Sequence, residues 1–455
     1  MDPGDEPRVR DFRVLTIGSG RTCEELRKAL DARGFGVAGR LAAAPESATD
    51  LRRAVLGAEL VLFCGEPGER PQTFTRIDHA CAAHNRPCLH VSFKGGAIMV
   101  GPMFVPRRTA CFRCSRRFLS CFDDGAEKTS PAASWMSALA ATAVADEIAA
   151  FLDHGAHLRV ASCIEIAPYE RAQRHSNAVT TAYTPTLTAC QVCGAPERVS
   201  DADARAGRPG AAFIVGSQRS GTTLLGLALG AHEAIEWLDE DRAYAVLAEQ
   251  PGDGRRTRVY KVPNWTGAVS TFVTHFPGGA FLFMKRPALQ IVASMLTLRG
   301  FAGTSWAERF AAIEARVAMA AFADPHASDV LERHYRRAAG DTVLMATMCA
   351  VAKQALMSEY RRSRLRVLEV DHGQLVADPK AVLSGVLDFI GLPWSDRVLD
   401  SHLLAGGTTI GKTERGRAID GASIDKHTRV LGSEAVTKIR SFEQSLLGDL
   451  AAASA

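Results

Sequence analysis

The feature that most constrains the fold is the segment Phe213–Leu225, where an apolar run enters a glycine-containing turn and then a helical pattern. Gly216 and Gly221 stand five positions apart in this segment. Such a strand–turn–helix unit points backbone N–H groups and a helix N-terminus at an anion. The spacing is that of an ATP-binding P-loop, but Thr222 stands where that loop needs a lysine, which disfavours a kinase or nucleoside triphosphatase. We therefore expect the turn, called here the glycine loop (residues 216–221), to bind another anionic group; a glycine turn that only packs on a sheet is the alternative.

Composition and length set further bounds. The 455 residues suffice for two or three domains, and 47% apolar with 23% charged residues is ordinary for a globular protein. The formal net charge of +4 is too small to indicate a nucleic-acid partner and agrees with small anionic ligands. Residues 1–10 lack the apolar segment of a signal peptide, and the apolar stretch 132–152 contains Asp146 and Glu147. We expect that stretch to be a buried helix, with no membrane span, in a cytoplasmic protein.

The chain repeats one local pattern. An apolar strand at 12–17, a glycine turn, a helical run at 23–33 and a second strand at 59–64 predict an α/β layer with a parallel sheet. Residues 196–210 lack apolar periodicity, and the strand–turn–helix pattern restarts at Ala211. These signals predict an N-terminal domain at 1–195, a linker at 196–210 and a C-terminal domain at 211–455.

The C-terminal half resembles a known family. The loop sequence Arg219-Ser-Gly-Thr-Thr, together with Arg286 after an apolar run and Ser294 eight residues later, resembles sulfotransferases that use 3′-phosphoadenosine-5′-phosphosulfate (PAPS), most closely the tyrosylprotein type. The resemblance covers nearly all of residues 211–450 and departs from the family at Pro287, where an Asp is usual. It implies a P-loop-like domain with a parallel sheet flanked by helices and PAPS as donor. The implied donor-binding residues are Gly216, Arg219, Ser220, Gly221, Thr222, Thr223, Arg286 and Ser294.

The same resemblance implies catalytic roles. Arg219 would hold the bridging and sulfuryl oxygens, because its planar fork can contact two oxygens at once. Lys261, at the end of an apolar strand, would stabilise the leaving oxygen; a solvated strand end is the alternative. Matching without gaps from the loop helix places Glu240 at the general base and Arg242 at a contact to an acidic or anionic substrate. A surface charge run is the alternative for this pair.

Other polar residues carry weaker signals. His232 and His275 lie near helix ends, and we expect them to be structural. The polar segment 406–432 contains Lys412, Arg415, Lys426 and Arg429, and resembles the family's cofactor-covering segment without assigning individual ligands.

Two cysteine pairs predict a metal site. Cys111-x-x-Cys114 and Cys190-x-x-Cys193 are turns of the kind that supply four thiolates to a closed, structural zinc site. A redox pair is the alternative. The odd total of 11 cysteines also fits metal ligands and reduced thiols better than a disulfide framework.

The N-terminal half resembles another group of proteins. The motif at residues 95–111 and the terminal Cys190-x-x-Cys193-Gly resemble ubiquitin-activating-enzyme-like (ThiF-like, Rossmann-like) zinc proteins of azoline-forming peptide biosynthesis, which present precursor peptides. The opening Gly18-Ser-Gly20 lacks the third glycine of a dinucleotide fingerprint, so we expect a non-catalytic docking domain.

Together these patterns predict a PAPS-dependent sulfotransferase with a hydroxyl acceptor, for which a tyrosine of a precursor peptide or peptide natural product is one candidate. The open alternatives are sulfation of a carbohydrate or small-molecule natural product, and a non-enzymatic docking scaffold with a vestigial nucleotide site. Whether the protein forms a homodimer is also left open.

Overall fold

The computed structural model describes residues 12–94, 96–119, 134–154, 162–166, 179–183, 190, 192–193, 198–200, 211–240, 243, 256–301, 304–404, 419 and 424–453. The chain divides into two compact units, residues 1–195 and 196–455. Of the expected linker at 196–210, only residues 198–200 are described. There the Val199 amide donates to the Ser363 carbonyl at 3.0 Å, an ordinary hydrogen-bond length.

The first unit is built on a seven-stranded sheet with the order β2-β1-β3-β4-β5-β6-β7. Its strands are β1 (Arg13–Ile17), β2 (Gly36–Leu41), β3 (Leu60–Cys64), β4 (Cys88–Lys94), β5 (Ala97–Phe104), β6 (Ser162–Ile166) and β7 (Val179–Tyr183). The first four are parallel, as predicted, but β5, β6 and β7 extend the sheet in antiparallel fashion. Two residues join β4 to β5, too few for the crossover that a parallel pair requires.

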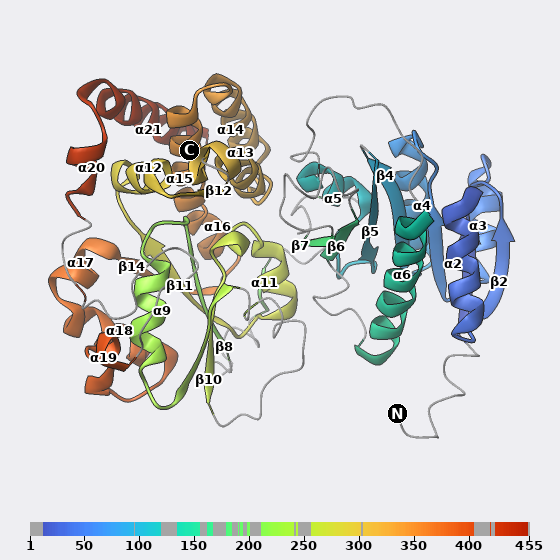
Figure 1. Cartoon of the computed structure of the whole chain (residues 1–455), viewed down its shortest axis with the longest axis horizontal. Coiled ribbons are helices and arrows are strands. Elements are labelled where there is room, and N and C mark those ends of the chain that lie inside the picture. Colours follow the sequence, from blue (N-terminus) through green and yellow to red (C-terminus); the bar gives the residue numbers. More distant parts are fainter. Residues whose placement is uncertain are drawn as a thin grey trace. The chain divides into compact units, whose positions relative to one another are not determined.

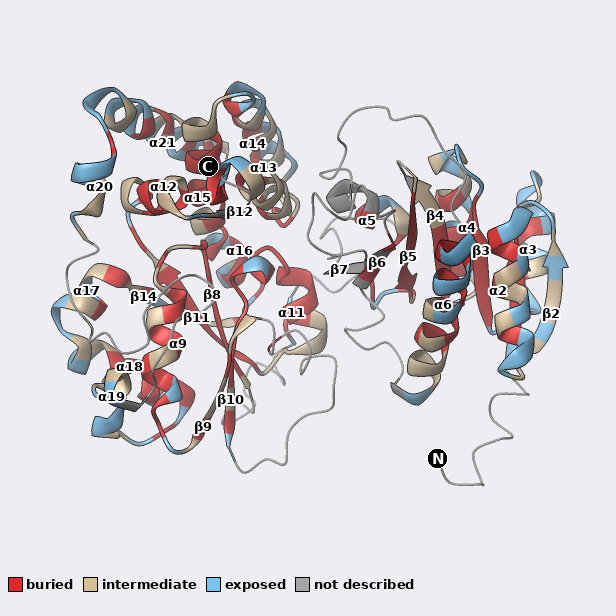
Figure 2. Ribbon diagram, viewed as in Figure 1, coloured by how far each residue is buried: buried red, intermediate tan, exposed pale blue. Residues whose placement is uncertain are grey.

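Helices cover both faces of this sheet. Alternating side chains of the strands divide between two cores: Val14 packs with α2 (Gly20–Ala32) and α6 (Ser134–His154), and Leu15 packs with α3 (Ala48–Leu56) and α4 (Pro71–Ala83). Strands β3 and β5 are buried along their whole length (Figure 2).

By length and composition, α6 is the one helix among the described residues that could cross a membrane. Its residues Met136, Ala140, Val144 and Ile148 are buried at a spacing of four, in the same core as α2. This placement agrees with the predicted buried helix.

The second unit contains a five-stranded sheet with the order β14-β11-β8-β10-β9, parallel throughout as predicted (Figure 1). Its strands are β8 (Ala211–Gly216), β9 (Ile235–Leu238), β10 (Thr257–Lys261), β11 (Ala280–Lys285) and β14 (Arg366–Asp371). The central strand β8 is apolar and buried on both faces, which is typical of a parallel sheet covered by helices.

One face of this sheet packs against α9 (Thr222–Gly230) and α18 (Pro379–Ile390) through aliphatic side chains. The other face is aromatic: Phe213 and Phe281 pack against Phe272 of α11 (Val269–His275) and Phe281 also against Tyr360 of α16 (Met357–Arg362).

Further helices complete the unit. Helix α15 (Thr342–Ala355) packs against α12 (Ala288–Thr297), α13 (Trp306–Met319), α14 (Pro325–Ala338) and α21 (Ser433–Ala453), as Figure 1 shows. The remaining elements are η2 (Pro263–Trp265), the short strands β12 (Arg299–Phe301) and β13 (Thr304–Ser305), α17 (His372–Ala377), η3 (Asp396–Val398), α19 (Ser401–Leu404) and α20 (Lys426–Val430). In the first unit, α5 (Phe112–Leu119) follows β5.

Candidate functional site

The predicted site residues of the second unit lie at one edge of its sheet. Strand β8 ends at Gly216, β10 ends at Lys261, and β11 is followed by Arg286. Because all five strands are parallel, their carboxyl ends share an edge. The chain moves from β8 to one side of the sheet and then crosses to the other, which makes the end of β8 the place where a ligand binds in such sheets.

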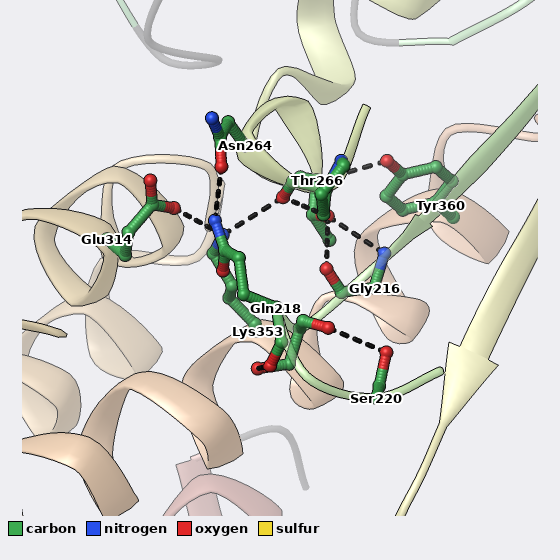
Figure 3. A network of polar contacts seen from close by, with 10 residues as sticks. Gly216, Gln218, Ser220, Asn264, Thr266, Glu314, Lys353 and Tyr360 are labelled. Atoms are coloured by element: carbon green, nitrogen blue, oxygen red, sulfur yellow. Dashed lines mark hydrogen bonds and ion pairs between the residues drawn. The ribbon is translucent and has the colours of Figure 1, made fainter. Parts of the chain in front are cut away.

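Two positions of the glycine loop accept only glycine, because of their backbone conformation and close neighbours. Gly216 has φ +126°, and a Cβ there would lie 2.6 Å from the Met284 carbonyl oxygen. Gly221, at φ +105°, is the residue before α9, and its Cβ would lie 2.5 Å from Cδ2 of His372. Hydrogen bonds hold the loop from outside and from within: the Gly216 amide donates to the Thr266 hydroxyl at 2.9 Å, and inside the loop the Ser220 hydroxyl donates to the Ser217 carbonyl at 2.6 Å (Figure 3).

Three of the eight residues predicted to bind the donor are joined by hydrogen bonds through Arg219. Arg219 Nε donates to the Ser294 hydroxyl at 3.0 Å. Arg286 Nη1 donates to the carbonyl of Arg219 at 3.0 Å, and its Nε donates to Gln290 at 2.9 Å. Pro287, where the sequence departs from the family pattern, is the residue directly before α12.

The charge of Arg219 lowers the pKa of two neighbouring cations, Arg286 and Lys426. Burial, and next the charge of Arg219, lowers the pKa of Arg286 to about 10. Burial also lowers the pKa of Arg219, opposed by the charge of Glu240. The pKa of Lys426 in α20 is lowered by burial and then by the charges of Arg219 and Arg286. We call Arg219, Arg286 and Lys426 the cation cluster. Three cations brought together against their mutual repulsion form a site suited to a multiply charged anion.

The predicted lysine and base form an ion pair. Lys261 is buried, with 2% of its side chain exposed, and its Nζ lies 2.7 Å from Glu240 Oε1. The same Nζ donates to Asp239 Oδ1 at 2.9 Å. Both carboxylates follow β9, the neighbour of β10 in the sheet, so the pairing of the two strands brings them to the lysine. Lys261 is thus not a solvated strand end.

Other residues are placed as follows. His232 accepts the Ala234 amide on Nδ1 and contacts the Pro393 carbonyl through Nε2, each at 3.0 Å, in the structural role predicted for it. Arg242, Lys412 and Arg415 lie outside the described residues. The sequence analysis did not single out Asp239, although the acidic run after β9 was an available signal for it. It also assigned no role to Lys426.

His372 was also missed. It begins α17 directly after β14, is 3% exposed, and lies against Gly221. Burial, and next the charge of Arg286, lowers its pKa to about 4, so its ring is neutral at neutral pH. Its Nδ1 is buried and has no hydrogen-bond partner among the described residues.

In the first unit, the four predicted metal ligands converge. The four Sγ atoms of Cys111, Cys114, Cys190 and Cys193 lie within 4.8 Å of one another. Cys111 and Cys190 are 3.6 Å apart and Cys114 and Cys193 are 3.5 Å apart, too far for disulfides. A tetrahedral zinc with sulfur ligands needs sulfurs about 3.8 Å apart, so the four residues fit the ion.

A buried pair supports this cysteine cluster. Asp78 of α4 contacts Nε2 of His90 at 2.7 Å through one oxygen and accepts the amide of Phe112 at 2.7 Å through the other. Phe112 follows the first cysteine and stacks on Phe74, with centroids 3.9 Å apart. Asp78 and His90 therefore hold the turn that carries the first cysteine pair, a role the sequence did not reveal.

The chain was compared with solved structures and with curated proteins. Solved structures similar to the chain include E. coli MccB with AMPCPP and MccA (15% identity, 42% of this chain and 68% of that one, TM-score 0.33). They also include the sulfotransferase domain of the curacin biosynthetic pathway (16% identity, 51% and 96%, TM-score 0.35) and that of a Synechococcus olefin synthase (17% identity, 52% and 96%, TM-score 0.31). No curated protein matches the sequence of the chain.

A family model matches part of the second unit. Residues 240–396 match the model of the sulfotransferase family. The match begins at Glu240 and includes Lys261, Arg286 and Ser294, while the glycine loop precedes it. The segment that carries these four predicted site residues therefore has the sequence pattern of a sulfotransferase.

Proposed function

We propose that the protein transfers a sulfuryl group from PAPS to a hydroxyl acceptor, at the carboxyl edge of the second unit's sheet. The observation that carries the proposal is the cation cluster beside a glycine loop that has no P-loop lysine. PAPS presents two separate anionic groups, the 5′-phosphosulfate and the 3′-phosphate, and the cluster offers cations from separate segments to meet them. Sulfuryl transfer itself, without regard to the donor, is supported by the family match over residues 240–396.

In this proposal the two ends of the donor bind to different elements. The 5′-phosphosulfate binds to the amides of the glycine loop and to Arg219, with Thr222 and Thr223 at the start of α9. The 3′-phosphate binds to Arg286 and Ser294, at the start of α12 and within it. Arg219 and Ser294 already share a hydrogen bond, so the two subsites adjoin. The expected contact of Arg242 with an anionic acceptor also remains part of the proposal.

The reaction then needs a base on one side of the sulfur and a cation on the other. The acceptor oxygen forms a bond to sulfur while the bond from sulfur to the phosphate oxygen breaks, and that oxygen keeps the electron pair. Glu240 takes the proton of the hydroxyl. Lys261 and Arg219 stabilise the charge that builds on the leaving phosphate. Lys261 and Glu240 lie 2.7 Å apart, so the proposal requires their ion pair to open. Glu240 then turns to the acceptor, while Asp239, 2.9 Å from the lysine Nζ, retains Lys261 on the side of the leaving phosphate.

For the acceptor, we propose a tyrosine of a peptide, with residues 1–195 as a docking domain and 211–455 as the transferase domain. The support is the glutamate at the base position and the resemblance of the N-terminal half to proteins that present precursor peptides. The same resemblance, and the convergence of four sulfurs, supports a structural Zn²⁺ held by the cysteine cluster. Such an ion links two chain segments and supplies no reaction chemistry.

The competing hypothesis is a docking scaffold with a vestigial nucleotide site. The contacts among Arg219, Ser294 and Arg286 count against it, because a site released from selection has no reason to retain buried cations in mutual repulsion.

The test is calorimetric binding of adenosine 3′,5′-bisphosphate to the full-length protein, with ATP as comparison. We expect micromolar binding of the bisphosphate, at least about tenfold weaker binding to the Arg286→Ala variant, and no binding of ATP. A protein that is folded and loaded with zinc but binds neither nucleotide would support the scaffold instead.

A further inference from the structure

A buried lysine lies behind the glycine loop. Lys353 of α15 is fully buried, and its Nζ donates to Gln218 Oε1 at 2.7 Å and to the Pro263 carbonyl at 3.0 Å. It also forms an ion pair with Glu314 of α13 (Figure 3). An ammonium group has three donors, so these three partners fix its position. Because all three are protein groups, Lys353 does not serve as a ligand for the donor.

The lysine determines how Gln218 is oriented. The oxygen of the Gln218 amide accepts from Lys353, and its nitrogen donates to Asn264 Oδ1 at 2.5 Å. With both ends of the amide engaged, the side chain has one orientation. We call Lys353, Glu314, Gln218 and Asn264 the lysine network.

The lysine network contacts the glycine loop next to Arg219, whose backbone conformation is strained. Gln218 precedes Arg219, which has φ +71°, a left-handed conformation that is unfavourable for an arginine. Such a conformation persists only where the surrounding structure imposes it. Asn264 and Pro263 lie just after Lys261 in the chain, so the network also touches the segment that carries the second cation of the proposed reaction.

We propose that Lys353 and Glu314 are positioning residues: through Gln218 they hold the glycine loop in the conformation that presents Arg219 and the loop amides to the 5′-phosphosulfate. This inference rests on the proposed function and adds residues that touch neither donor nor acceptor. If Lys353 and Glu314 served stability alone, apolar side chains of similar volume could replace them without changing ligand affinity, because such side chains can supply the stability that a buried ion pair contributes.

The decisive variant is therefore the double replacement Lys353→Met with Glu314→Leu, which leaves no buried charge unpaired. Its ligand affinities are measured by calorimetry on the full-length protein for adenosine 3′,5′-bisphosphate and for adenosine 3′-monophosphate. The ratio of the two affinities isolates the contribution of the 5′-phosphate, which in the proposed function binds to the glycine loop and the start of α9. Gln218→Leu removes the link between lysine and loop and serves as a second variant. Glu359→Gln is the control: Glu359 is 5% exposed, and its partners Arg362 and the Ala323 amide lie outside the loop.

We expect the double variant and Gln218→Leu to lose about tenfold or more of the preference for the bisphosphate, while the affinity for the monophosphate changes less than about twofold. Unchanged preference in the double variant would overturn the inference. An equal loss for both ligands would also overturn it, since that outcome indicates general disruption. If the wild-type protein itself shows no preference for the bisphosphate, the proposed function fails, and the inference fails with it.

Discussion

At the scale of single residues, the proposed base can be separated from the donor site. Glu240→Gln keeps the volume of the side chain and removes its ability to take a proton. We expect transfer of labelled sulfate from PAPS to a phenolic acceptor to fall about 10²- to 10⁴-fold, with bisphosphate affinity retained. Glu236→Gln is the control, since Glu236 lies on β9, the strand that Glu240 follows, and pairs with Arg258 at 2.9 Å. Full activity of Glu240→Gln would contradict the assignment of the base.

His372 makes stability depend on pH. Its pKa is about 4 in the folded protein against an ordinary value of 6.5. Between pH 6.5 and about pH 4, His372 is protonated in the unfolded chain and neutral in the folded protein, so acid favours unfolding in this pH range. The stabilising contribution is fully present above pH 6.5 and is lost as the pH falls toward 4, about 3 kcal/mol in total.

The measurement is urea unfolding of the wild type and of His372→Gln at about pH 7 and about pH 5. We expect the wild type to lose about 2 kcal/mol more of its free energy of unfolding between these pH values than the variant does. His326→Gln, at an exposed position, is the control. Parallel pH profiles for wild type and His372→Gln would show that this histidine is not the group responsible.

At the scale of elements, the glycine loop depends on its backbone. Gly216→Ala would place a methyl group 2.6 Å from a carbonyl oxygen at φ +126°, and Gly221→Ala would bring one to 2.5 Å from the His372 ring. We expect each change to destabilise the second unit by more than about 1 kcal/mol and to abolish measurable bisphosphate binding. Gly385→Ala in α18 has open space around it and should be neutral or stabilising by up to about 1 kcal/mol. Thermal unfolding with calorimetry checks both; normal binding by Gly216→Ala would refute the loop's role.

Local elements were predictable from the sequence, and their distant partners were not. Apolar runs and turn glycines marked β1, β3 and β8 because those signals act within a few residues. The antiparallel pair of β4 and β5 was missed, although Gly95-Gly96 between two apolar runs is a hairpin signal.

The site shows the same limit. The predicted residues lie at or just after the ends of strands of one sheet, so a resemblance in short motifs sufficed to find them: Gly216, Arg219, Lys261 and Arg286. Lys353 and Lys426 reach the site from helices α15 and α20, and a lysine within a helical pattern ordinarily indicates a solvated surface. Only tertiary packing distinguishes them from other lysines of the chain.

At the scale of the whole molecule, the proposed zinc site and the donor site lie in different units. We expect removal of zinc by a chelator, or the Cys190→Ser variant, to destabilise the first unit strongly, because binding of a structural metal contributes directly to folding. Bisphosphate binding by the second unit should persist. Differential scanning calorimetry, metal analysis and ligand titration on the full-length protein test both statements.

The control for this experiment is Cys81→Ala, which removes a fully buried cysteine of the same unit outside the metal cluster. That variant should retain one zinc per chain. A structural metal would be excluded if the purified protein contained no zinc and a chelator left its unfolding temperature unchanged.

The buried contact between Lys353 and Gln218 spans 135 positions of the chain. A designer who grafts residues 213–225 onto another parallel sheet would transfer the glycines and Arg219 but leave behind the ammonium that orients Gln218. A search that scores this short segment alone would likewise accept sequences in which no such lysine exists. The portable unit is therefore the loop together with α13 and α15, and transplantation should include all three.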